Sequence, residues 1–138
     1  MLYLERLIGN PTIMNLDNEV KQQIDHWVAK YPPNEKRSAV VPALLIVQQH
    51  NGGWLSEPAM DAVAAYLDLA RIEVYEVATF YDMFELAPVG QHKIAICTNV
   101  ACMLRGSQQI AEAAKKRLGI NFGETTQDGR FYLREVEC

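Results

Sequence analysis

The sequence predicts an α+β protein, in which a helical N-terminal half precedes a half built as strand, helix and two strands. Apolar residues recur at helical spacing through about the first 86 residues. The period then changes after the stretch ELAPVGQ, and the last third combines a short continuous apolar run with a hairpin signal. We therefore expect two domains: an N-terminal helical bundle at residues 1–86 and a smaller α/β domain at residues 87–138.

Three helices are predicted first, each from apolar residues spaced by three or four positions. They cover residues 17–31, 39–50 and 57–70. Ser38 and Ser56 stand where the side chain of a helix N-cap accepts from free backbone N–H groups. The second helix is apolar nearly all round, so we expect it to be buried.

A fourth helix is predicted over residues 71–84, RIEVYEVATFYDMF. Its apolar positions continue at helical spacing to Tyr81 and Phe84, which we expect in the core. The neighbouring Phe80 points elsewhere on such a helix, toward a partner.

The second domain is predicted to contain a strand, a helix and a hairpin. The run HKIAIC, residues 92–97, is apolar on both faces and predicts a central strand. Residues 106–119 predict a helix capped by Ser107. Its inward positions are Ile110, Ala111, Ala114 and Leu118. Asp128–Gly129 is a two-residue hairpin signal between the last two strands.

Composition and charge exclude several classes of protein. The 13 basic and 17 acidic residues give a net charge of -4 with no long run of either sign, so nucleic acid is not an expected partner. Glu5 and Arg6 interrupt the apolar start, which argues against a signal peptide or direct membrane insertion. Three cysteines without a secretory signal argue against a disulfide framework. We expect a soluble protein that faces the cytosol.

The three cysteines are the residues of the chain whose type and position best suit metal binding or redox chemistry. Cys97 ends the predicted strand, Cys102 follows in a predicted loop just before the helix, and Cys138 ends the last hairpin strand. That strand can fold back beside the first one, which brings three soft ligands to one rim. A helix N-terminus at the same rim favours negative charge, such as a thiolate-ligated cluster.

The spacing alone leaves other interpretations open. The cysteines can be three small buried hydrophobic residues, or part of a Cys3His zinc site with His92 as fourth ligand, although His92 falls on the opposite face of a regular strand. C-x4-C opens the plant-type ferredoxin motif, but Arg105 stands where the next ligand belongs. A C-x-x-C motif is absent from the sequence.

The sequence carries no recognised catalytic or nucleotide-binding motif of its own. It lacks G-x-G-x-x-G, a Walker loop, H-E-x-x-H and G-x-S-x-G. His26 and His50 are expected as surface or capping residues. If the chain takes part in redox chemistry, a partner must supply the electrons.

Four ordered stretches carry a resemblance to a known family. They are ALLIVQQHNGGWLSEPAMDAVAAYL, VYEVATFYDMF, CTNVACMLRGS and GETTQDGRFYLREVEC. Together they resemble the family of the E subunit of NADH-quinone oxidoreductase, respiratory complex I, from about Val20 to the C-terminus. The resemblance implies a helical N-terminal region followed by a thioredoxin-like domain, a [2Fe-2S] ferredoxin that holds one cluster.

The resemblance also implies the ligands. The family binds its cluster through C-x4-C and a later C-x3-C; Cys97 and Cys102 match the first pair, and Cys138 matches the third ligand. The fourth cysteine, four positions after Cys138 in the family, is absent from this sequence. We therefore expect a truncated thioredoxin-like domain in which the cluster is labile or lost.

The implied function is electron transfer by a subunit that is not catalytic alone. The resemblance places it in an oxidoreductase and translocase that passes electrons from NADH to quinone, beside the subunit that binds NADH and FMN and among other peripheral-arm subunits. It implies a position at the cytoplasmic face of the bacterial inner membrane. The equivalent subunit of an NAD-linked hydrogenase or formate dehydrogenase fits as well, and a structural adaptor with a zinc or metal-free cysteine site is the alternative from another class.

Overall fold

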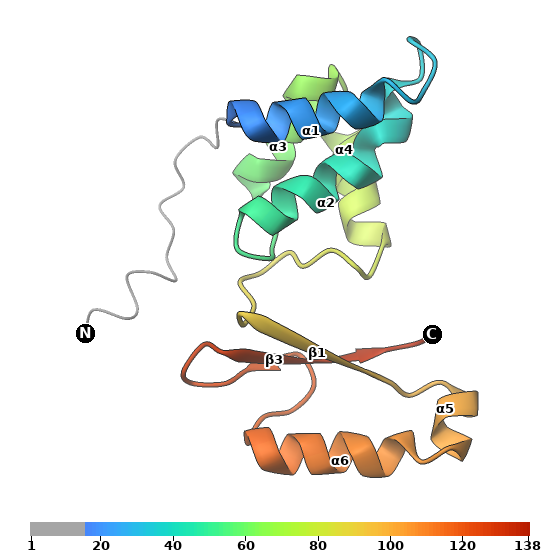
Figure 1. Cartoon of the computed structure of the whole chain (residues 1–138), viewed down its shortest axis with the longest axis vertical. Coiled ribbons are helices and arrows are strands. Elements are labelled where there is room, and N and C mark those ends of the chain that lie inside the picture. Colours follow the sequence, from blue (N-terminus) through green and yellow to red (C-terminus); the bar gives the residue numbers. More distant parts are fainter. Residues whose placement is uncertain (1–15) are drawn as a thin grey trace. The chain divides into compact units, whose positions relative to one another are not determined.

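The computed structural model describes residues 16–138, which form helices in the first part of the chain and a small sheet with two further helices in the second (Figure 1). The predicted α+β fold class is confirmed. The chain divides into two compact units at the bond between Pro88 and Val89.

The described part of the first unit is helical. It contains α1 (Asn18–Val28), a 3-10 turn η1 (Lys36–Ala39), α2 (Val40–His50), α3 (Glu57–Leu67) and α4 (Arg71–Phe80). Its core is formed by apolar residues from all four α-helices, and the largest side chains with no or almost no exposure are Ile24, Val40, Leu44, Val47, Leu55, Val63, Leu67 and Val74. As predicted, α2 is the most completely buried of these helices, with six buried residues of eleven.

Side-chain caps fix where two of these helices begin. Asp17 Oδ1 accepts from the Val20 backbone N–H at 2.8 Å, and Ser56 Oγ accepts from that of Ala59 at 3.3 Å. The prediction that Ser38 caps the second helix is wrong, because Ser38 lies inside η1, which runs directly into α2.

The fourth helix is shorter than predicted. It ends at Phe80, because Tyr81 adopts an extended conformation with φ -89° and ψ 125°. Phe84 is buried, with 5% of its surface exposed, as expected of a core residue. Tyr81 is 41% exposed, so its assignment to the core is wrong.

The second unit is a three-stranded sheet with helices. Its elements are β1 (His92–Cys97), α5 (Val100–Leu104), α6 (Ser107–Leu118), β2 (Glu124–Thr125) and β3 (Phe131–Val136). β1 pairs with β3 in parallel, and β2 pairs with β3 antiparallel. The central strand of the described sheet is therefore β3, and the prediction that residues 92–97 form a central strand is wrong.

One helix, α6, lies along a face of this sheet (Figure 1). The buried residues between them are Ile96, Ala111 and Leu133, packed against Ile94, Ala114, Leu118, Ile120 and Phe122. Ile110 was expected inward but is 61% exposed. Ser107 is not the cap either: Gly106, with φ 96°, takes that position, and Ser107 is the first helical residue.

The hairpin between β2 and β3 has a longer connection than the predicted two-residue turn. The last backbone pair joins the Thr126 N–H to the Phe131 carbonyl at 2.8 Å, which leaves residues 127–130 as the loop. Gly129 adopts φ 70°, a conformation that glycine reaches without strain. Near the start of β1, Gly90 lies so close to β3 that an added Cβ would sit 2.7 Å from the Phe131 carbonyl carbon.

No helix among residues 16–138 is long and apolar enough to cross a membrane. The expectation drawn from Glu5 and Arg6 falls on residues outside the described part of the chain.

Candidate metal centre

The parallel pairing of β1 and β3 brings two of the cysteines together. In the register of this pair Cys97 lies opposite Val136, and the Thr98 N–H continues the ladder to the Val136 carbonyl at 3.0 Å. Cys138 follows two residues later, where side chains again point to the same face of the strand. Its backbone N–H donates to Cys97 Sγ at 3.2 Å. Both sulfurs therefore lie at the carboxyl ends of parallel strands, where open α/β sheets commonly bind ligands.

The third cysteine comes from a short helix after β1. Cys102 lies inside α5, which follows Asn99 directly, whereas the sequence predicted a loop at this point. The Met103 N–H donates to the Asn99 carbonyl at 2.8 Å and closes the turn that carries Cys102. Gly106 then redirects the chain into α6.

The three sulfurs form a compact set. All lie within 4.8 Å of one another, and Cys102 Sγ is 3.6 Å from Cys138 Sγ. Two thiolates bound to one tetrahedral metal at about 2.3 Å lie about 3.8 Å apart, which is close to the distance between Cys102 Sγ and Cys138 Sγ. Among the described residues, these cysteines are the only group of three or more His, Cys, Asp or Glu side chains close enough to share a metal.

Hydrogen bonds at this site shift the thiol pKa values apart. The pKa of Cys97 is lowered to about 7, first by the Cys138 thiol and then by the backbone N–H groups of Asn99 and Cys138. The pKa of Cys102 is raised to about 12, because its thiol hydrogen-bonds to Cys97 and Cys138, with smaller contributions from burial and from the charges of the other two cysteines. Cys97 is therefore the first of these two cysteines to form the thiolate that a metal needs.

The donor set suits a soft metal. Several sulfur donors gathered at one place are typical of zinc or of iron–sulfur centres. Cys97 and Cys102 are half-buried and Cys138 is exposed, so a metal bound here lies at the surface of the unit. The three cysteines thus fit an iron–sulfur cluster as ligands.

His92 does not belong to this set. It stands at the start of β1, five residues from Cys97, which corresponds to about 16 Å along a strand. Its ring packs near Phe131, with ring centroids 5.6 Å apart. The alternative of a zinc site with His92 as fourth ligand is therefore wrong.

The neighbourhood of the cysteines includes features that the sequence analysis missed. Thr98 Oγ1 donates to Glu135 Oε1 at 2.8 Å and ties the ends of β1 and β3 together. Large apolar side chains around Cys102 are exposed: Val100 by 64%, Met103 by 48% and Leu104 by 77%. The apolar run VACML was a visible signal for this surface, but the prediction of a loop there hid it.

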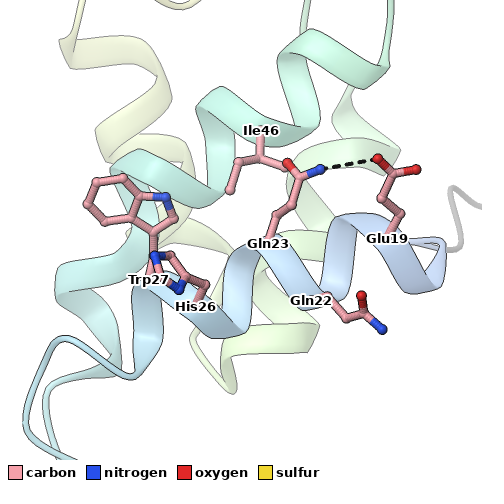
Figure 2. A pocket seen from close by; sticks show the side chains of 6 residues that line it. All are labelled: Glu19, Gln22, Gln23, His26, Trp27 and Ile46. Atoms are coloured by element: carbon pink, nitrogen blue, oxygen red, sulfur yellow. Dashed lines mark hydrogen bonds between the residues drawn. The ribbon is translucent and has the colours of Figure 1, made fainter.

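A depression in the helical unit offers no second ligand set. Figure 2 shows the residues of α1 and α2 that line it: Glu19, Gln22, Gln23, His26, Trp27 and Ile46. Glu19 accepts from Gln23 Nε2 at 3.4 Å, and Gln22 points away from the other polar groups. His26 is a surface residue, as expected. His50, the second histidine expected at the surface or as a cap, is in the last turn of α2, and its Nδ1 lies 2.9 Å from the Ile46 carbonyl oxygen.

Three cysteine thiols gathered at the strand ends of a small α/β unit form a candidate metal-thiolate site in a protein of the α+β class. The chain belongs to the thioredoxin-like [2Fe-2S] ferredoxins, whose family model matches residues 24–138. Its cysteine set and its family are both consistent with a [2Fe-2S] cluster.

Individual relatives give a more specific comparison. The chain is 50% identical over 127 residues to a Rickettsia conorii protein named as the E subunit of NADH-quinone oxidoreductase, a match that covers 92% of the chain and 76% of the relative. A Rickettsia typhi protein of the same name is 50% identical over 111 residues, which is 80% of the chain and 65% of the relative. The mitochondrial NADH dehydrogenase [ubiquinone] flavoprotein 2 of Dictyostelium discoideum is 46% identical over 122 residues, which is 88% of the chain and 49% of the relative. The chain thus spans about two thirds to three quarters of the Rickettsia relatives and about half of the Dictyostelium one.

Proposed function

We propose that this chain is the electron-transfer subunit of an NADH-quinone oxidoreductase, holding one [2Fe-2S] cluster beside a partner subunit that binds NADH and FMN. The observation that carries the proposal is the set of three thiols within 4.8 Å at the ends of β1 and β3. The relatives are named as subunits of NADH-quinone oxidoreductase or NADH dehydrogenase, which supports the choice of this complex. As part of that complex the chain acts at the cytoplasmic face of the bacterial inner membrane.

The roles of the cysteines follow from their positions. Cys97 is held by the strand ladder, and Cys138 follows two residues after the end of β3 and is tied to Cys97 Sγ through its backbone N–H, whereas Cys102 enters from α5. The Cys138 backbone N–H that donates to Cys97 Sγ stabilises negative charge on that sulfur. A [2Fe-2S] cluster takes four ligands, of which these cysteines would supply three. When bound, the cluster accepts and gives up one electron at a time.

The apolar surface of α5 suits the approach of the electron-donating partner. Val100, Met103 and Leu104 are largely exposed on the helix that carries Cys102. Soluble proteins seldom expose such clusters of large apolar side chains without a binding role. A partner that covers α5 would exclude water from the cysteines and bring its own redox group close to them.

Single cysteine variants test this proposal in the purified protein. We expect Cys97→Ser, Cys102→Ser and Cys138→Ser each to lose the visible absorbance and most of the iron that the unaltered chain takes up on anaerobic reconstitution with iron, sulfide and an excess of a small thiol, which supplies the fourth ligand. His92→Ala is the matched control, since His92 is a metal-ligand residue type on the same strand, and it should keep both. Binding of zinc without sulfide by the unaltered chain would instead support a structural adaptor and overturn the electron-transfer proposal.

A further inference from the structure

A second exposed apolar surface lies in the helical unit, where α4 ends. Phe80 is 78% exposed, and Tyr81, Met83 and Leu86 are exposed by 41%, 40% and 45%. These four residues, here called the aromatic loop, fall within seven positions of the chain. The rings of Phe80 and Tyr81 pack edge to face, with centroids 5.0 Å apart. Aromatic side chains and methionine are enriched at the centres of protein interfaces.

The aromatic loop is held in a fixed conformation. Gln48 is buried in α2 and reaches the loop with both ends of its amide. Its Oε1 accepts from the Glu85 backbone N–H at 2.8 Å, and its Nε2 donates to the Met83 carbonyl at 3.2 Å. The Leu55 N–H donates to the Glu85 carbonyl at 2.7 Å on the other side.

Buried residues anchor this segment, and the exposed residues beside them are thereby held at the surface. Phe84 is anchored in the core and Glu85 is buried, while Met83 and Leu86 on either side remain outside. The loop is therefore already ordered in the folded chain. This favours binding, because a preordered surface loses less conformational entropy on association.

The charge around the aromatic loop is negative. Residues 72–91 contain four acidic residues, at positions 73, 76, 82 and 85, and no Lys or Arg. Arg37 pairs with Glu73 and Glu76 at 3.5 and 3.7 Å and offsets part of this charge. The loop also begins at the C-terminus of α4, the negative end of the helix dipole, and the last turn of α4 carries no basic residue.

The imbalance extends over the whole described helical unit. Residues 16–88 contain five Lys and Arg against eleven Asp and Glu, a formal charge of -6, whereas residues 89–138 contain seven against five, a formal charge of +2. A partner that covers the aromatic loop is therefore expected to surround an apolar centre with basic residues.

We propose that the aromatic loop is a docking surface for such a partner, an apolar protein face with a basic rim, carried by the NADH- and FMN-binding subunit. This inference rests on the proposed function for the choice of partner. It adds a contact that is independent of the cysteines and located in the helical unit.

The test is the dissociation constant between the purified chain and the purified NADH- and FMN-binding subunit from the same organism, measured by calorimetry. We expect Phe80→Ala to raise Kd about tenfold or more, as for an interface centre. Ile72→Ala is the matched control, because Ile72 is a 63% exposed apolar residue at the other end of α4, and it should leave Kd unchanged. Raising the salt from about 0.05 M to about 0.5 M should weaken binding, because charges at the rim contribute to it.

The outcomes separate this inference from the proposed function. If the unaltered chain does not bind the NADH- and FMN-binding subunit, the choice of partner in the proposed function is wrong. If it binds and Phe80→Ala binds equally well, only the proposed docking surface is wrong. A dissociation constant that does not change with salt would contradict the proposed basic rim of the partner. If the chain alone sediments as a dimer that Phe80→Ala dissociates, a second copy occupies this surface and the choice of partner is overturned.

Discussion

Replacement of Gln48 by leucine is the mutation whose cost follows most directly from the structure. Gln48→Leu keeps roughly the volume of the side chain but removes its donor and acceptor. The backbone N–H of Glu85, a buried residue, then loses the Gln48 oxygen to which it donates, at a cost of about 1–3 kcal/mol. The Met83 carbonyl lies on a residue that is 40% exposed and can turn to water. We therefore expect a loss of about 2 kcal/mol in the free energy of unfolding.

Urea unfolding followed by tryptophan fluorescence measures this loss in the right part of the molecule. Both tryptophans, Trp27 and Trp54, belong to the helical unit, so their emission reports its unfolding. The midpoint should fall without a change in the slope m. Gln23→Leu is the control, since the Gln23 side chain makes an exposed contact at 3.4 Å, and it should stay within about 0.5 kcal/mol. An unfolding free energy for Gln48→Leu equal to or above that of the parent would refute the stabilising role of the Gln48 hydrogen bonds.

Three further predictions concern the core, a tyrosine and a thiol. Leu133→Ala, at a fully buried position, should cost about 2–5 kcal/mol in urea unfolding followed by circular dichroism, whereas Leu104→Ala, at a 77% exposed one, should cost little; equal effects would contradict the assigned core. Burial and a 2.7 Å hydrogen bond to Asp25 raise the pKa of Tyr66 from 10.0 to about 12, so the neutral phenol is favoured in the folded state and stability should fall as pH rises from about 10 to about 12. Tyr66→Phe should reduce that fall in the urea midpoint, and an unchanged pH profile would count against the bond. Hydrogen bonds lower the pKa of Cys97 to about 7, so the rate of its alkylation in metal-free protein, measured by mass spectrometry, should be half-maximal near pH 7. A midpoint near the ordinary thiol pKa of about 8.5 would contradict the hydrogen bonds assigned to Cys97.

Local chemistry made several elements predictable from the sequence. Ser56 begins α3 as expected, because a serine before an acidic and proline-containing first turn has few competing conformations. The approach of Cys138 to Cys97 also followed from a general rule, since a strand, a helix and a returning strand place two parallel strands side by side. The three-sulfur site is thus largely visible in the order of the elements.

Other features depend on contacts that are distant in the sequence. The helical period runs through Tyr81, but α4 ends at Phe80. The segment that follows is held by hydrogen bonds from Gln48 to the backbone of Met83 and Glu85, which are 35 and 37 positions away in the sequence. Ile110 has the spacing of an inward residue, yet a sheet of three short strands covers only a narrow stripe of α6 and leaves it exposed. Strand order is likewise non-local, so the apolar composition of residues 92–97 did not reveal that β3 takes the centre.

The decisive measurement is the content of iron, zinc and acid-labile sulfide per chain, together with the electron paramagnetic resonance spectrum after reduction. It is made on protein purified anaerobically in an excess of a small thiol, which supplies the fourth ligand. We expect about two irons and two sulfides per chain, no zinc, and a one-electron signal that appears on reduction. Zinc in place of iron, or iron without sulfide, would contradict the claim that Cys97, Cys102 and Cys138 hold a [2Fe-2S] cluster.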